Sequence, residues 1–146
     1  MDIVQRPECH VVGVEVVTGS FAELRDAVPP AWRTVFARHR DLPPAPGGLF
    51  ADVSTELDGG GYREVLGVLT ESAAAPPDGM RVVALPAGTF LRHTFSGPVE
   101  AVADAYGAMY AWATEHAVRL GRWKIDTGYR PGFPAGPHEL LMDIAG

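Results

Sequence analysis

Asp126 is the residue of this chain with the clearest potential for chemistry, because it follows the apolar residues Trp123 and Ile125 in an expected strand. A carboxylate buried among apolar side chains is costly unless it is paired or hydrogen-bonded. Such a group attracts a cationic ligand or, once burial raises its pKa, acts as a base toward water. Alternatively, Asp126 faces solvent and pairs with Lys124 or Arg130. The residues themselves leave both interpretations open.

Aromatic residues form the second candidate set. Aromatic faces carry negative potential and bind cations or flat rings, each contact contributing roughly 0.5–2 kcal/mol. The candidate lining residues are Trp32, Phe36, Phe50, Tyr62, Phe90, Tyr110, Trp112, Trp123 and Tyr129. Many aromatic residues of any domain belong to its core, so we favour a smaller group for a pocket: Trp32, Phe36, Phe50, Tyr110 and Trp123. Tyr106 and Phe95 are assigned to the core.

Other kinds of site receive little support. The five histidines are scattered, with no pair at ligand spacing on one face, and Cys9 is the only cysteine. The sequence has no glycine-rich loop leading into a helix and no serine in a nucleophile elbow. We therefore expect no metal site, no cofactor and no covalent catalysis. The acidic residues Asp52, Glu56, Asp58 and Glu64 are interpreted as a solvated hairpin.

Composition limits the possible partners. The 146 residues are 47% apolar and 21% charged, as in an ordinary soluble domain. A net charge of −6 argues against direct binding of nucleic acid, which requires clustered Lys and Arg. No stretch is long and apolar enough to span a membrane, and no signal peptide is recognisable. We expect a single cytoplasmic domain over residues 1–146.

The hydrophobic pattern predicts that one short order of elements occurs twice. A strand, a helix and two strands are expected at Val11–Val17, Pro30–Arg40, Leu49–Thr55 and Tyr62–Glu71. The second set is expected at Phe90–Phe95, Val99–Ala117, Trp123–Tyr129 and Glu139–Ile144, with a further strand before a turn at Pro86–Gly88. Pro29 and Pro30 should divide the first helical segment into two pieces. Loops are expected at 41–48 and 130–137, a hairpin at 57–61, and a linker at 73–79.

The predicted fold class is therefore α+β. Two strand–helix–strand–strand units, at about 9–72 and about 80–145, would join into one curved antiparallel sheet with two main helices. The seam between the units would form a cleft, and clefts of this kind commonly hold ligands.

Five segments in this order resemble the gyrase-inhibitor-like (GyrI-like) family, the stand-alone form of the effector-binding domain of AraC- and MerR-type activators. They read AVPPAWRTVF, GLFADVSTELDGGGYREVLGV, LPAGTFLRHTFSGP, AMYAWATEHAVRL and HELLMDIA. The resemblance implies a duplicated strand–helix–strand–strand fold that binds bulky, often cationic molecules at its seam. It also implies aromatic walls and an acid in a Phe-Glu-x-Tyr pattern. Here Ile125–Asp126 stands in place of Phe-Glu, and the tyrosine is displaced to Tyr129.

The resemblance implies three possible functions, each compatible with the candidate residues. The first is binding of a bulky hydrophobic or cationic small molecule by a stand-alone sensor or a sequestering, multidrug-resistance protein, with Asp126 selecting charge. The second is hydrolysis of cyclopropane-bearing or other electrophilic natural products, with Asp126 orienting a water as the catalytic residue. The third is an interaction module that acts on a protein such as gyrase, although a charge of −6 is modest for mimicry of DNA.

Overall fold

The computed structural model describes residues 1–73, 75–132 and 136–146. It contains eight strands: β1 (Asp2–Arg6), β2 (Cys9–Thr18), β3 (Phe50–Glu56), β4 (Tyr62–Thr70), β5 (Arg81–Leu85), β6 (Gly88–Gly97), β7 (Leu120–Tyr129) and β8 (Gly136–Ile144). Its two α-helices are α1 (Phe21–Ala37) and α2 (Val102–Glu115), and its short 3-10 helices are η1 (His39–Asp41), η2 (Pro46–Gly48) and η3 (Val99–Ala101). The predicted linker and the second predicted loop include residues 74 and 133–135, which lie outside the described residues.

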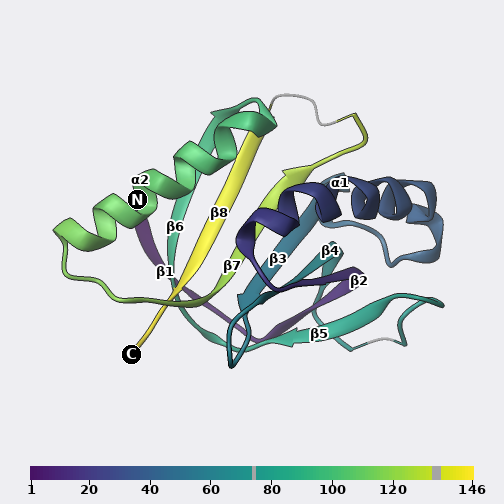
Figure 1. The fold of residues 1–146 in the computed structure, drawn as a ribbon, viewed down its shortest axis with the longest axis horizontal. Helices are drawn as coiled ribbons and strands as arrows, with labels where there is room; N and C mark the ends of the chain where they lie inside the picture. The colour runs from purple at the N-terminus through teal and green to yellow at the C-terminus, as the bar shows by residue number, and fades with distance from the viewer. Residues whose placement is uncertain (74, 133–135) are drawn as a thin grey trace.

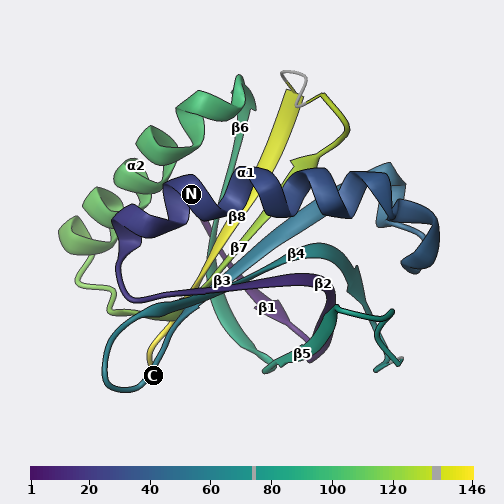
Figure 2. The ribbon, with the colours of Figure 1, turned by 45° about the vertical axis from the view of Figure 1, so that its right-hand side comes forward.

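All eight strands form one antiparallel sheet in the order β1-β6-β8-β7-β3-β4-β2-β5. The two helices lie over this curved sheet (Figures 1 and 2). The predicted α+β class, with a curved antiparallel sheet and two main helices, is thereby confirmed. Within the described ranges, no helix is both long and apolar enough to cross a membrane.

The two edge strands are exchanged between the halves of the sheet. Strand β1 leads directly into β2 but pairs with β6, and β5 leads directly into β6 but pairs with β2. Each crossing contains one proline, Pro7 or Pro86, which cannot extend a ladder of hydrogen bonds. Strand β1 was not predicted from the sequence, because a five-residue edge strand is specified by its distant partner more than by its own pattern.

Helix α1 runs without a break through Pro29 and Pro30, so the prediction of two helical pieces was wrong. The helix begins at a reciprocal cap. The Ser20 side chain accepts from the Glu23 N–H, and the Glu23 carboxylate accepts from the Gly19 N–H. Both prolines are exposed, whereas Leu24 before them and Trp32 after them are buried. Packing on both sides of the prolines outweighs the loss of two helical hydrogen bonds.

Strand alternation divides the sheet into two faces. One face packs under α1, through residues such as Val12 and Leu66, and under α2, through Leu91 and Leu140. The other face carries a separate core that includes Val53 and Ile125. Strands β3 and β7 meet at the centre of the sheet, where Val53 is paired with Ile125. Their neighbours in sequence therefore project toward the two helices.

Candidate functional site

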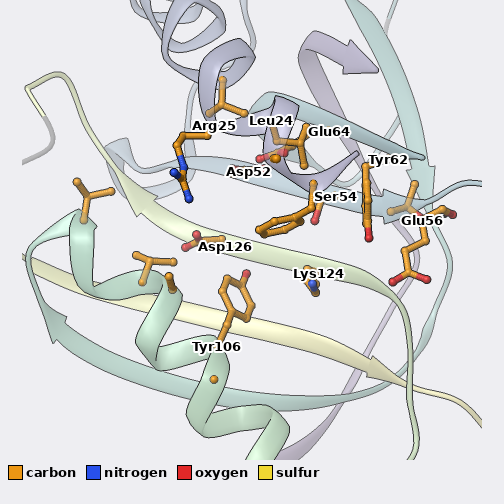
Figure 3. A pocket seen from close by; sticks show the side chains of 18 of the residues that line it. Leu24, Arg25, Asp52, Ser54, Glu56, Tyr62, Glu64, Tyr106, Lys124 and Asp126 are labelled. Atoms are coloured by element: carbon orange, nitrogen blue, oxygen red, sulfur yellow. Dashed lines mark hydrogen bonds between the residues drawn. The ribbon is translucent and has the colours of Figure 1, made fainter. Parts of the chain in front are cut away.

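A cavity of about 620 Å³ lies on the helical face, across the seam between β3 and β7. Figure 3 shows labelled side chains from both helices and from the central strands surrounding it. The residues that line it are Phe21, Ala22, Leu24, Arg25, Val28, Pro29, Asp52, Ser54, Thr55, Glu56, Tyr62, Glu64, Val99, Val102, Ala103, Tyr106, Gly107, Tyr110, Arg122, Lys124, Asp126 and Tyr129. Such a volume lies in the usual range for a small-molecule site.

Three carboxylic acids lie at the floor of this cavity. Asp52 and Asp126 are paired directly opposite each other across the seam, and Glu64 extends from the adjacent strand β4. Glu64 is 7% exposed and Asp126 is 4% exposed. Burial, followed by the charge of Glu64 and a hydrogen bond with it, raises the pKa of Asp52 well above its usual value. The floor therefore gathers carboxylic acids whose ionised forms are disfavoured by burial and by one another, and which have few partners within the described part of the protein.

The interpretation of these acids as a solvated hairpin holds only for part of the set. Glu56 and Asp58 are exposed at the end of the hairpin, and Asp58 pairs with Arg122. Asp52 and Glu64, in contrast, project into the cavity. Asp52 precedes Val53 and Glu64 precedes Val65, and both valines belong to the core on the opposite face. This alternation was the signal that could have placed the two acids beside Asp126.

Asp126 has the smallest exposed fraction of the three acids. Its Oδ2 accepts a hydrogen bond of 2.5 Å from the Tyr129 hydroxyl, whereas its Oδ1 has no hydrogen-bond partner among the described residues. The nearest imidazole nitrogen, Nδ1 of His138, is 3.9 Å from Oδ1. Burial raises the pKa of Asp126 to about 7, against the opposing effect of the Tyr129 hydrogen bond. The alternative in which Asp126 faces solvent and pairs with Lys124 or Arg130 was wrong.

Four aromatic rings border the cavity above these acids: Phe21, Tyr62, Tyr106 and Tyr110. Tyr62 and Tyr110 were predicted as lining residues, as was Tyr129 at the floor. Tyr106 was assigned to the core, but it lies between the core under α2 and the cavity, where burial raises the pKa of its phenol. Phe21 was not considered, because it lies at the first turn of α1 and is 66% exposed.

Some of the predicted lining residues lie elsewhere on the helical side. Trp32 and Phe36 stack at 5.2 Å and border a smaller hollow of about 390 Å³ beside Pro131. Phe50 is buried against Phe36, with their ring centroids also 5.2 Å apart. These three rings therefore support α1 on the sheet, outside the acidic cavity.

The remaining predicted lining residues also lie outside the acidic cavity. Phe90, 2% exposed, and Trp123 pack in the core on the opposite face of the sheet. Trp123 and Asp126 are three residues apart in a strand, so alternation sets them on different faces. Trp112 stacks on His116 at the end of α2, with centroids 3.9 Å apart.

Basic side chains also reach the cavity, namely Arg25, Arg122 and Lys124. The Lys124 ammonium lies over aromatic rings, 5.3 Å from the centroid of Tyr110. In the part of the chain that the structure describes, no group of three or more His, Cys, Asp or Glu residues could hold a metal ion. The acids and rings of the cavity are suited to organic cations, which need charge and apolar contact together.

This chain has two helices over a curved antiparallel sheet, with a ligand-sized cavity between them. It belongs to the Cass2 family, described as integron-associated effector binding proteins, which its sequence matches over residues 2–129. The resemblance to stand-alone effector-binding domains is thereby confirmed. A search of curated proteins found no significant match.

Solved structures share the fold at low sequence identity. The structure of SAV2435 bound to tetraphenylphosphonium has a TM-score of 0.78 and 15% identity, with 99% of this chain and 93% of that chain covered. An integron cassette protein from the mobile metagenome of Vibrio cholerae has a TM-score of 0.73 and 11% identity, with 99% and 95% covered. The C-terminal domain of EcmrR has a TM-score of 0.63 and 13% identity, with 99% and 96% covered.

Proposed function

We propose that this protein binds a bulky organic cation in the cavity at the β3–β7 seam, as a sensor or a sequestering protein. The observation that carries the proposal is the acid trio of Asp52, Glu64 and Asp126, the last two of them buried, beneath a largely apolar wall that includes aromatic rings. Asp126 Oδ1 is buried without a hydrogen-bond partner, so an entering cation would complete its electrostatic environment.

The proposed ligand carries diffuse positive charge inside an apolar shell. A small hydrated cation would have to lose its water to reach the floor, whereas a phosphonium or quaternary ammonium is weakly hydrated and gains contact with the rings. The fold relative bound to tetraphenylphosphonium supplies a probe of this class. Membership of an effector-binding family supports ligand binding in general.

Isothermal titration with two probes of matched shape tests the proposal. Tetraphenylphosphonium and tetraphenylborate have four phenyl groups each and opposite charge, so their comparison separates charge selection from apolar burial. We expect the phosphonium to bind and the borate not to bind. Asp126→Asn should weaken phosphonium binding about tenfold or more, because it removes a buried charge facing the ligand. Glu115→Gln, an exposed change on α2, should bind as the wild type does.

Equal binding of the two probes would contradict the proposal, because apolar contact alone would then explain the affinity. Binding of the phosphonium that survives unchanged in Asp126→Asn would place its site elsewhere. A chain that binds neither probe would also contradict the proposed ligand class.

Hydrolysis of a strained electrophile is the second candidate, and Asp126 is the observation in its favour. A carboxyl that lines a cavity, with a pKa of about 7 and one oxygen without a hydrogen-bond partner among the described residues, is suited to accept a proton from an attacking water. Incubation with a cyclopropane-bearing alkylator followed by mass spectrometry would reveal a product heavier by one water. Loss of that product in Asp126→Asn, with ligand binding retained, would favour catalysis, and an unaltered ligand would favour binding alone.

A further inference from the structure

Lys124 is the only lysine of the chain, and it lies inside the candidate site. It is paired opposite Ser54 on the cavity face of β7, two residues before Asp126. The other basic side chains of the chain are arginines, which carry a planar guanidinium in place of a compact ammonium. The cavity thus contains a single flexible side chain that ends in a primary ammonium.

The Lys124 ammonium is surrounded by aromatic rings. Its Nζ lies 5.3 Å from the ring centroid of Tyr110 and 5.8 Å from the centroids of Tyr106 and Phe21. All three distances fall within the range of cation–π attraction. None of the ion pairs formed by the described residues involves Lys124, although three carboxylic acids border the same cavity.

These three rings come from both helices. Phe21 is the first residue of α1, whereas Tyr106 and Tyr110 lie one turn apart on α2. Figure 3 shows Lys124 and Tyr106 in the same cavity as Asp126. The ammonium therefore bridges the two helices above the acidic floor, at a position where the apolar shell of an organic cation would rest.

We propose that Lys124 is a tethered cation that occupies the aromatic subsite, and that an organic cation must displace it to bind. This inference rests on the proposed function, and it identifies Lys124 as the residue with which a ligand must compete for the rings. Two positive charges cannot share the three rings without repulsion, so an entering ligand competes with the ammonium. Glu56 is exposed, also lines the cavity and lies on β3 two residues after Ser54, the partner of Lys124, so its carboxylate is a candidate to receive the displaced ammonium.

Displacement would favour bulky, weakly hydrated cations. A ligand must replace the contacts of Lys124 with the rings, and only a cation with a large apolar shell can exceed them. Small ammonium ions would gain nothing over the resident group. Lys124 is thus a specificity-determining residue for the class of cation that the cavity accepts.

The uncomplexed protein provides the first test. Selective labelling with ε-¹³C lysine gives a single side-chain resonance, because the chain has one lysine. Ring currents from three rings should shift the ε-methylene protons upfield of their ordinary position, and saturating tetraphenylphosphonium should restore that position. An ordinary position in the uncomplexed protein would overturn the inference whatever the ligand result.

The second test compares the affinity of tetraphenylphosphonium for three variants. Lys124→Met keeps the length of the stem without the charge and should bind about tenfold more tightly than the wild type. Lys124→Arg keeps a cation for the rings and should bind like the wild type. Arg119→Met, an exposed position on the loop before β7, makes the same change in net charge and should not alter affinity.

The outcomes distinguish the displacement of Lys124 from the proposed binding of an organic cation. If the wild type binds tetraphenylphosphonium and Lys124→Met does not bind it more tightly, the inference is overturned and the proposed function stands. If only Lys124→Met binds tetraphenylphosphonium, the inference is supported, and the wild type excludes this probe from the proposed site. Absence of binding in both overturns the proposed function together with displacement, while the lysine resonance separately reports whether the aromatic subsite is occupied.

Discussion

The Tyr129 hydroxyl donates a hydrogen bond of 2.5 Å to Oδ2 of Asp126, three residues earlier on the same strand. In a regular strand these two positions would face opposite sides of the sheet. They share a side because of a β-bulge. Phe50 is paired with Tyr129 and Ala51 with Thr127, so Gly128 is the extra residue. The bulge therefore brings the phenol to the carboxylate at the floor of the cavity.

Gly128→Ala should destabilise the protein by about 2–4 kcal/mol. Gly128 has a φ of 116°, and a Cβ added there would lie 2.6 Å from the carbonyl oxygen of Pro137. Urea unfolding measures the change. Gly107→Ala is the matched control, because a Cβ at this position of α2 meets nothing within 4 Å and should stabilise the helix by about 0.5–1 kcal/mol. A Gly128→Ala protein as stable as the wild type would contradict this role of the bulge.

Asp126→Asn should stabilise the ligand-free protein at pH 8 by about 1–3 kcal/mol and change it little at pH 4. Burial raises the pKa of Asp126 from 3.8 to about 7 on folding. Between these values the folded chain binds more protons than the unfolded chain, so the free energy of unfolding falls as pH rises. Asparagine remains neutral and still accepts the hydrogen bond from Tyr129.

Denaturant unfolding of the Asp126→Asn variant and the wild type at both pH values measures this difference. Glu115→Gln, which removes an exposed charge from α2, should follow the wild type at both. A stabilisation of the same size at pH 4 and pH 8 would show that proton binding by Asp126 is not its cause.

The fold could be predicted largely from local signals. Valine-rich β2 and the glycine-rich turn before β4 carry strong strand and hairpin patterns, and α2 has an apolar face. Two features depended on distant partners and were missed. Strand β1 exists through its pairing with β6, and the prolines of α1 are tolerated because Leu24 and Trp32 are buried on either side.

The candidate site could be predicted only in part, because its residues come together through the pairing of β3 with β7. Asp126 was recognised as an acid in an apolar strand. Asp52 has the same alternation but was assigned to the hairpin, since its position opposite Asp126 appears only once the register is known. Trp123 was predicted to line the pocket, but strand alternation sets it on the face opposite Asp126.

Tyr106→Leu should weaken the binding of tetraphenylphosphonium by about threefold to thirtyfold, as expected for loss of one aromatic contact with a cation. Tyr106 borders the cavity from α2. Trp112→Leu is the control on the same helix, because Trp112 stacks on His116 away from the cavity and should leave affinity unchanged. Titration calorimetry measures both. Equal losses in the two variants would indicate a general effect on α2 and would contradict a specific contact.

The affinity for tetraphenylphosphonium should rise about tenfold between pH 6 and pH 8. With a pKa of about 7, Asp126 is mainly protonated at the lower pH and mainly ionised at the higher one. Burial lowers the pKa of His138, the imidazole nearest Asp126, which disfavours its charged form beside the carboxyl.

Titration calorimetry at pH 6, 7 and 8 checks this dependence, and buffers with different enthalpies of ionisation count the protons released on binding. Because a bound cation favours the ionised carboxyl, binding near pH 6.5 should release a fraction of one proton to the buffer. Asp126→Asn should lose most of that release and most of the pH dependence. A wild-type affinity that stays constant from pH 6 to pH 8, with no proton released, would mean that the ligand does not contact the acidic floor.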